Sequence, residues 1–273
     1  MSDDNLQTVS GALSPLGSDW AAIGAQFGAK LAMVAGECPQ HGPAEVLTRA
    51  GAAWSCPRCL EMAMAAETRA LWLQTRAADL MATATIPAKY VGQRFVASTD
   101  EQRIVLRTAQ QYRDFILREP AWAALILVGI TGTGKTLLAC QLGQSLISKA
   151  SRSVRYITAA GMISEIQASY GREGKSEEGE IMRFAQYDIL ILDEIDAIRN
   201  TDNANLLLTE IINRRYNEAK PVIVISNQPF DNLARYVGER VHSRLYENAF
   251  VCDFRWADQR RAGVNQPALQ VVR

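Results

Sequence analysis

The sequence lacks a surplus of charge, a long apolar run and any internal repeat. Its 29 basic residues are balanced by 29 acidic ones, which argues against a protein coated in nucleic acid but still allows a confined basic groove. It contains neither a signal peptide nor a run of ~20 apolar residues, so we expect a cytoplasmic protein without a membrane partner. With 273 residues, of which 48% are hydrophobic, the chain is long enough for two domains.

Cysteine and histidine are also scarce, with five and two copies, yet four of these residues form two closely spaced pairs. The pairs are Cys38 with His41, and Cys56 with Cys59. Sulfur and imidazole ligands at this spacing suit tetrahedral Zn²⁺, and a site with four protein ligands is structural because no position is left for water. Two disulfides are the alternative, but one position is a histidine and no export signal is present. We expect Cys140 and Cys252 to be buried apolar residues.

The most specific motif is a glycine-rich phosphate loop at residues 129–136, which follows the apolar run 124–128 and fits G-x-x-x-x-G-K-[ST]. Its backbone N–H groups and the start of the next helix offer a site for the phosphates of a nucleoside triphosphate such as ATP. Lys135 is placed to reach the β- and γ-phosphates, and Thr136 to ligate Mg²⁺. The alternative is a Gly/Thr-rich turn before a core helix. The expected nucleotide contacts are Gly129, Thr131, Gly132, Thr133, Gly134, Lys135, Thr136 and Asp193.

Two further apolar runs end in the polar side chains that this chemistry needs. Residues 189–192 are typical of a strand buried on both faces, and Asp193 and Glu194 follow them. Asp193 is placed to hold Mg²⁺, and Glu194 to polarise the water that attacks the γ-phosphate. The run 221–226 ends at Asn227, which we expect beside the γ-phosphate because ligands of open α/β sheets collect at the carboxyl ends of strands. A solvated acidic turn and a turn asparagine are the alternatives.

The order of these motifs resembles that of AAA+ ATPases, and residues 95–260 resemble the DnaC-type loaders of replicative helicases. The stretch 238–245 reads G-E-R-V-H-S-R-L. The resemblance implies that Arg244 is an arginine finger that acts in trans on the ATP of a neighbouring subunit, with Arg240 as the alternative. The stretch 254–260 resembles the family's closing F-x-W-x-x-x-R, which makes Arg260 the expected second sensor of nucleotide, with Arg261 as the alternative. Without the resemblance, the stretch 238–245 would be interpreted as a solvated helix.

Two helical stretches, 159–170 and 177–185, precede the acidic strand. This paired insertion resembles the element with which the initiator and loader branch of AAA+ proteins lines a channel for single-stranded DNA. In that interpretation Tyr170 stacks on a base, while Arg172 and Lys175 contact phosphates. A flexible, solvated loop would show the same glycines and mixed charges, so both interpretations stay open.

The domain organisation predicted from composition has four segments. They are a partly ordered leader at 1–36 with a short helix at 19–34, a zinc-binding partner module at 37–85, a linker at 86–95 and an ATPase domain at 96–273.

Helical spacing predicts a helix over residues 60–81 in the partner module. Its core-facing stripe is expected to contain Leu60, Met64, Leu71 and Ala78. Trp72 and Leu73 point off that stripe. Such side chains either form a partner surface or pack on the zinc module, and the resemblance implies a helicase as the partner.

These features predict an α/β fold: an AAA+ phosphate-loop ATPase with a doubly wound parallel sheet, plus a small N-terminal zinc-binding helical module. The resemblance implies an ATP-dependent loader that delivers a DnaB-type ring helicase onto single-stranded DNA in replication initiation. It would bind the helicase through its N-terminal module and self-associate on helicase or DNA.

A transposition ATPase resembling IstB, which binds duplex DNA and a transposase, is the alternative function. The zinc module favours the loader, because compact IstB-like chains typically lack such knuckles. A scaffold with a decayed ATPase is disfavoured, because the full set of expected catalytic residues is present. That set is Lys135, Thr136, Asp193, Glu194 and Asn227.

Overall fold

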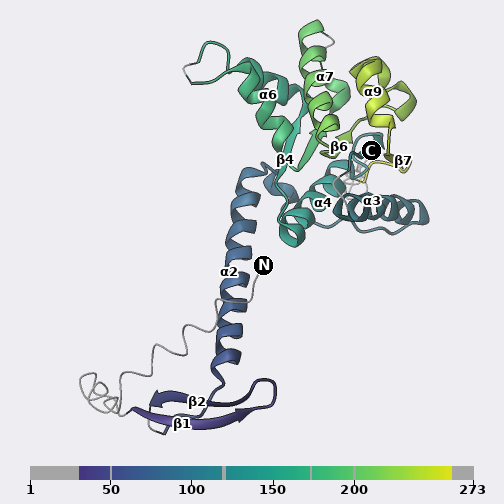
Figure 1. Cartoon of the computed structure of the whole chain (residues 1–273). Helices are drawn as coiled ribbons and strands as arrows, with labels where there is room; N and C mark the ends of the chain where they lie inside the picture. Colours follow the sequence, from purple (N-terminus) through teal and green to yellow (C-terminus); the bar gives the residue numbers. More distant parts are fainter. Residues whose placement is uncertain (1–30, 50, 119–120, 173, 199–200, 260–273) are drawn as a thin grey trace, which may run out of the picture. The chain divides into compact units, whose positions relative to one another are not determined.

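The computed structural model describes residues 31–49, 51–118, 121–172, 174–198 and 201–259 (Figure 1). The chain divides into two compact units, Met1–Trp72 and Leu73–Arg273. The larger unit contains the sheet and the nucleotide motifs, and the smaller unit contains the four expected zinc ligands. Within the ranges given above, no helix is both long enough and apolar enough to cross a membrane.

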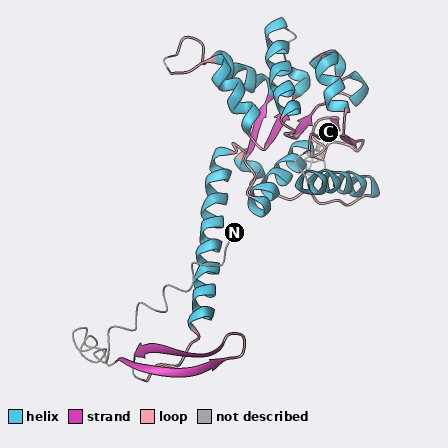
Figure 2. Ribbon diagram, in the orientation of Figure 1, coloured by secondary structure: helices cyan, strands magenta, loops and turns pink. Residues whose placement is uncertain are grey.

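Five parallel strands form the sheet of the larger unit in the part of the chain that the structure describes (Figure 2). In sheet order they are β4 (Val154–Thr158), β5 (Ile189–Asp193), β6 (Val222–Ile225), β3 (Ala124–Gly129) and β7 (Ala249–Phe254). β3 pairs with β6 and β7, and β6 also pairs with β5. Because parallel strands share one carboxyl edge, the ends of β3, β6 and β5 are neighbours. The predicted α/β fold with a parallel sheet is confirmed.

The strands are buried on both faces, since their alternate side chains enter two separate apolar cores. Leu125 and Leu127 of β3 lie in the core formed with α3 (Asp100–Arg118) and α4 (Lys135–Ala150). Ile126 and Val128 lie in the opposite core. The helices of that core are α5 (Ala159–Gln167), α6 (Glu177–Gln186), α7 (Asp202–Asn217), α8 (Ala234–Val237) and α9 (Glu239–Tyr246). Helices on both faces make the sheet doubly wound and explain why its apolar runs are continuous rather than alternating.

The two helices of the insertion are confirmed, and each begins at a side-chain cap. Thr158 Oγ1 accepts the N–H of Gly161 (3.1 Å) at the start of α5. Ser176 Oγ accepts the N–H of Gly179 (3.0 Å) at the start of α6. Each cap satisfies one of the four N–H groups that the start of a helix leaves unbonded.

The smaller unit contains a β-hairpin that the sequence did not predict. β1 (Leu31–Cys38) pairs antiparallel with β2 (Gly42–Arg49), and Cys38 opposite Gly42 closes the ladder at the turn. The predicted helix at 19–34 is therefore wrong at residues 31–34, and residues 19–30 lie outside the described ranges. The expected leader likewise overlaps β1 at residues 31–36. Cross-strand pairing overrides the helix propensity of the alanine and methionine residues in this strand.

The helix α2 (Pro57–Thr83) confirms the predicted helix over residues 60–81. The prediction that one stripe of this helix faces a core was wrong. No described residue of α2 is buried, and Leu60, Met64 and Leu71 are 48%, 66% and 64% exposed. Trp72 and Leu73, on the other stripe, are also exposed. Periodicity shows which side chains share a face of a helix, but it does not show whether another part of the protein covers that face.

The segment expected to be a linker packs on the larger unit. Ala84 and Phe95 are buried in the core formed with α3 and α4. Between them lies the 3-10 helix η1 (Ala88–Tyr90), where the Tyr90 carbonyl accepts a hydrogen bond from Gln144 of α4 (2.9 Å). The compact units therefore divide within α2, whereas the expected boundaries lay at residues 85 and 95.

Candidate nucleotide site and metal centre

A hollow of about 350 Å³ lies at the carboxyl edge of the sheet, where β3, β5 and β6 end. Residues 131–137 form one side of it. The rest of the lining consists of Tyr90, Asp193, Glu194, Ile225, Asn227 and Gln259. The structure thus brings the phosphate loop, the acidic strand end and the polar strand end into one cavity, as the sequence predicted for a nucleotide site.

The backbone of the phosphate loop requires glycine at two positions. Gly132 has a φ of +78°, and a Cβ there would lie 1.7 Å from Oδ1 of Asp258. Gly129 has a φ of +130°, and a Cβ there would lie 2.4 Å from the carbonyl oxygen of Phe254. A side chain at Gly129 would therefore clash with the end of β7, and one at Gly132 with the segment that follows β7.

Lys135 lies inside the phosphate loop, with only 5% of its surface exposed. Its Nζ donates hydrogen bonds to the carbonyl oxygens of Gly129 (2.6 Å) and Ile130 (2.7 Å). The helix α4 begins at Lys135, and its N-cap residue, Gly134, has no side chain with which to cap the first N–H groups. A cation next to the start of a helix offers charge and donors to phosphate oxygens.

Thr136 and Asp193, the two residues expected to hold Mg²⁺, lie side by side. Thr136 Oγ1 donates to Asp193 Oδ2 (2.9 Å), and the N–H of Glu194 donates to Asp193 Oδ1 (2.8 Å). Asp193 is buried, with 5% of its surface exposed. A hydroxyl and a carboxylate side by side at the edge of a phosphate site are the oxygen ligands that Mg²⁺ prefers, so these residues fit the ion.

Tyr156 is a member of this site that the sequence analysis did not identify. Its hydroxyl donates to Asp193 Oδ2 at 2.7 Å from the neighbouring strand β4. Burial and the nearby Asp193 carboxylate raise the pKa of Tyr156, so the phenol keeps its proton at neutral pH. No sequence motif marks this tyrosine, because its partner is 37 residues away.

Glu194 and Asn227 lie at the two strand ends that face the phosphate loop. Glu194 adopts a left-handed backbone conformation with a φ of +52°, which is uncommon for a residue with a side chain. The backbone N–H of Asn227 donates to Asp196 Oδ1 (3.0 Å), which fixes the end of β6 against the turn after β5. The roles of both side chains in hydrolysis remain predictions.

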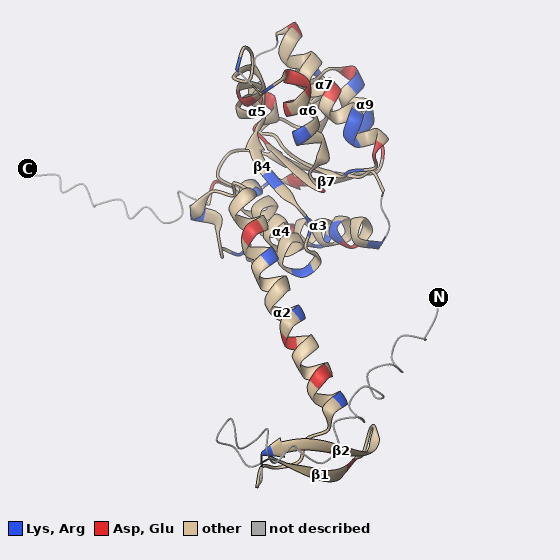
Figure 3. Cartoon of the chain, turned by 60° about the vertical axis from the view of Figure 1, so that its left-hand side comes forward, with Lys and Arg blue, Asp and Glu red and all other residues tan. Residues whose placement is uncertain are grey.

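Arg244 lies outside this hollow, on α9. Its guanidinium is 4.6 Å from the ring centre of Tyr216, and its carbonyl accepts a hydrogen bond from Trp122 Nε1 (2.8 Å). Arg244 Nη1 is shielded from solvent and has no hydrogen-bond acceptor among the described residues. Arg240 is exposed on the same helix, whose basic residues are visible in Figure 3. Both arginines line a second hollow, separate from that of the phosphate loop.

Arg260, the expected second sensor, lies outside the described residues. The residues just before it contact the phosphate loop. Trp256 Nε1 donates to the carbonyl of Thr133 (2.9 Å), and the N–H of Gln259 donates to the carbonyl of Gly132 (3.0 Å). These bonds hold the segment after β7 against the site.

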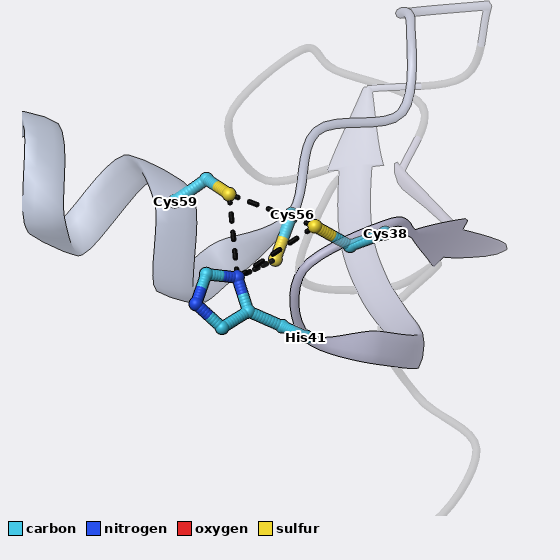
Figure 4. A group of neighbouring side chains, drawn as sticks. All are labelled: Cys38, His41, Cys56 and Cys59. Atoms are coloured by element: carbon cyan, nitrogen blue, oxygen red, sulfur yellow. Dashed lines mark hydrogen bonds between the residues drawn. The ribbon is translucent and has the colours of Figure 1, made fainter.

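The four expected zinc ligands form one cluster in the smaller unit (Figure 4). His41 Nδ1 lies 3.3 Å from the sulfur of Cys59 and 3.6 Å from those of Cys38 and Cys56. A tetrahedron with metal–ligand bonds of about 2.0 to 2.3 Å has edges of about 3.3 to 3.8 Å, so the cluster fits Zn²⁺. All five cysteines of the chain are free, and this geometry contains no disulfide.

The hairpin and the helix position these ligands. Cys38 ends β1, His41 lies in the turn, and Cys59 lies in the first turn of α2. Hydrogen bonding from the N–H of Gln40 lowers the pKa of Cys38 to about 6, which favours the thiolate that binds a metal. The hydrogen bond with Cys38, together with burial, raises the pKa of Cys59 to about 11 in the metal-free cluster.

The three residues proposed for DNA contact lie in or next to the turn between α5 and α6. Tyr170 is 46% exposed, and Arg172 and Lys175 are exposed as well. A hydrogen bond with Glu177 raises the pKa of Tyr170, and the Lys175 ammonium lies 3.9 Å from the carboxylate of Glu180. The turn is thus accessible, but its side chains also have acidic neighbours.

Arg215 is a structural residue that the sequence did not reveal. It is fully buried, and its guanidinium donates to five backbone carbonyls. The acceptors are the carbonyls of Phe184, Ala185, Tyr187, Asp188 and Pro221. They tie the end of α6 to the starts of β5 and β6. The expected burial of Cys140 and Cys252 is confirmed, and it raises the pKa of each thiol to about 12.

The five-stranded parallel sheet, the phosphate loop after β3 and the acidic end of β5 define a nucleotide-binding protein of the AAA+ class. The chain matches the family described as "IstB-like ATP binding protein" over residues 44–244, and it belongs to that family.

Known relatives support this assignment. "Uncharacterized protein YdaV" of Escherichia coli K12 is 29% identical over 176 residues, which cover 64% of this chain and 69% of YdaV. The replicative helicase loader DnaC of the same strain is 28% identical over 139 residues, or 50% of this chain and 56% of DnaC. The match therefore spans about half the length of that relative. A crystal structure of the DnaC helicase loader has a TM-score of 0.55 at 23% identity and covers 61% of this chain and 99% of that chain, which supports the fold.

Proposed function

We propose that this protein is an ATPase that loads a DnaB-type ring helicase onto single-stranded DNA. The observation that carries the ATPase part is the Thr136–Asp193 hydrogen bond beside Lys135, in a hollow that Glu194 and Asn227 also line. The helicase part is supported by the similarity to the replicative helicase loader DnaC.

In this proposal each residue of the hollow has a separate task. Lys135 and the N–H groups of the loop bind the phosphates, and Thr136 and Asp193 would hold Mg²⁺, which would supply positive charge next to the phosphate oxygens. Glu194 accepts a proton from the attacking water, and Asn227 orients that water. Hydrolysis then acts as a switch between two states of the loader.

The proposed helicase-binding part is the N-terminal module. Zinc held by the four ligands would fix the start of α2, where Leu60, Met62 and Met64 are 48%, 63% and 66% exposed. α2 carries six charged residues among 27, and most of it is uncharged in Figure 3. Exposed apolar side chains on one helix fit a protein partner with a complementary apolar groove.

A transposition ATPase is the second candidate, and the family match to IstB-like proteins favours it. In that case the partners would be duplex DNA and a transposase. The two functions differ in the form of DNA that the ATP-bound protein prefers.

We expect Tyr170→Ala to weaken binding of single-stranded DNA in the presence of ATP by about tenfold, because stacking contributes ~1–3 kcal/mol per base. Replacing both Arg172 and Lys175 by alanine should also flatten the salt dependence of binding, because fewer counterions are released. Fluorescence anisotropy with single- and double-stranded oligonucleotides measures both effects.

Matched variants separate stacking from loss of structure. Tyr170→Phe keeps the ring and should bind normally, and Arg103→Ala with Arg255→Ala removes two exposed cations elsewhere and should leave the salt slope unchanged. A preference for duplex DNA that none of these substitutions alters would reject the loader and favour the transposition ATPase.

We expect Arg244→Ala to slow hydrolysis by about 10³-fold, because a finger stabilises charge on the transferring phosphoryl group. Arg244 does not line the hollow of its own chain, so it would leave the Tyr216 ring and act on a neighbour. Mixing Arg244→Ala with Glu194→Gln protein should restore part of the activity, because some mixed interfaces then contain both residues.

Steady-state hydrolysis across a range of mixing ratios, with helicase and DNA present, measures this recovery. Arg240→Ala is the control on the same helix. Mixing it with Glu194→Gln protein should give no complementation. Normal hydrolysis by Arg244→Ala at every protein concentration would assign the finger to another residue.

A further inference from the structure

The carboxylate of Asp193 is held by three hydrogen-bond donors. Oδ2 accepts from Thr136 Oγ1 (2.9 Å) and from the hydroxyl of Tyr156 (2.7 Å), and Oδ1 accepts from the N–H of Glu194 (2.8 Å). Thr136 and Glu194 belong to the nucleotide motifs, whereas Tyr156 comes from β4, which carries no motif. Three donors on two oxygens fix both the position and the rotation of the carboxylate.

The backbone of Tyr156 is itself held by the segment that follows α2. β4 is the outermost strand on its side of the described sheet. On its open edge, the N–H of Tyr156 donates to the carbonyl of Ala84 (2.8 Å). Thr85 Oγ1 donates to the carbonyl of Tyr156. We call residues 84 and 85 the clip. Thr85 adopts a φ of +54°, so the clip makes its hydrogen bonds to Tyr156 with a backbone conformation that is uncommon for threonine.

We propose that Tyr156 is a positioning residue for the magnesium–nucleotide complex, which orients Asp193 and is in turn held by the clip. The inference rests on the proposed role of Asp193 in holding Mg²⁺. Groups that hydrogen-bond a carboxylate ligand orient it toward the metal, and losing one typically costs about 10- to 100-fold in metal affinity or activity.

Tyr156→Phe tests the proposal, because it removes only the hydroxyl. We expect the Mg²⁺ concentration for half-maximal binding of a fluorescent ATP analogue to rise about tenfold. Binding of the analogue in EDTA should stay unchanged, because the hydroxyl that this substitution removes donates to Asp193 of β5 rather than to the phosphate loop. The melting temperature of the nucleotide-free protein reports any general loss of stability.

Tyr112→Phe is the matched control. It also removes a buried tyrosine hydroxyl from the same unit, one that donates to the carbonyl of Val222 (3.1 Å). It should lower the melting temperature without changing the Mg²⁺ requirement. Thr85→Ala should raise the requirement about two- to threefold through loss of one neutral hydrogen bond, and Thr85→Ser, which keeps the hydroxyl, should not.

The outcomes distinguish this inference from the proposed function. Wild-type protein that binds the analogue equally well with and without Mg²⁺ would reject the metal role of Asp193 itself. A normal Mg²⁺ dependence in the wild type that Tyr156→Phe leaves unchanged would overturn the positioning role of Tyr156. A shift with Tyr156→Phe but none with Thr85→Ala would restrict the proposal to the side chain and reject the clip.

Discussion

Lys135→Ala is expected to lower the affinity for ATP by about 100-fold or more, whereas Glu194→Gln should leave it within about twofold of the wild type. The buried ammonium of Lys135 is placed to donate to phosphate oxygens, and each charge-assisted hydrogen bond contributes about 1.5–3 kcal/mol. Glu194 lines the same hollow at the end of β5 and is expected to serve as a proton acceptor rather than as a phosphate ligand. Its replacement should slow hydrolysis by about 10²- to 10⁴-fold.

Equilibrium binding of a fluorescent ATP analogue and single-turnover hydrolysis separate the two effects. Lys149→Ala is the control for Lys135, because it removes an exposed lysine from the other end of α4. Glu178→Gln is the control for Glu194, because it removes an exposed carboxylate from α6. An equal loss of binding in Lys135→Ala and Glu194→Gln would reject the assigned roles.

The second large effect is expected at the metal centre of the smaller unit. The purified protein should contain one Zn²⁺ per chain, and Cys56→Ser should release it and unfold the hairpin and the start of α2. A small unit of this kind depends on its metal, because binding of structural zinc contributes about 10–16 kcal/mol to folding. The larger unit should still bind nucleotide, because its core is separate from the smaller unit.

Metal analysis and limited proteolysis check this prediction, with Cys252→Ser as the control. Cys252 is buried in the core of the larger unit, away from the four clustered residues in the sequence. Its sulfur donates to the carbonyl of Val105 (3.5 Å), a bond that serine can keep. Acid should also release the metal, because protons compete for the ligands. Zinc-free protein with a Cys38 disulfide would contradict the assignment.

Much of the larger unit could be predicted from the sequence, because its signals are local. The continuous apolar runs before Gly129 and Asp193 identify strands buried on both faces, and both are found as central strands of the sheet. The phosphate loop could be predicted from one octapeptide, because its backbone conformation requires glycine at Gly129 and Gly132. The parallel order of the strands then brings Asn227 into the same hollow.

The smaller unit was predicted less well, because its structure depends on pairing rather than on propensity. The spacing of the cysteines and of His41 identified the cluster of candidate metal ligands, because a metal site needs the same ligand types in any fold. The hairpin that carries Cys38 was missed, because its register depends on which residues lie opposite one another. The exposure of α2 was also missed, since a stripe of apolar residues is the same whether or not another surface covers it.

The sequence by itself determined the nucleotide motifs, the candidate metal ligands and the class of fold, because each is encoded in neighbouring residues whose spacing the chemistry fixes. Only the tertiary structure decided which side chains support those residues. Tyr156 reaches Asp193 across 37 positions, and Arg215 binds carbonyls up to 31 positions away. Contacts of this kind depend on how strands and helices are placed in space, and no local pattern of residues records that placement.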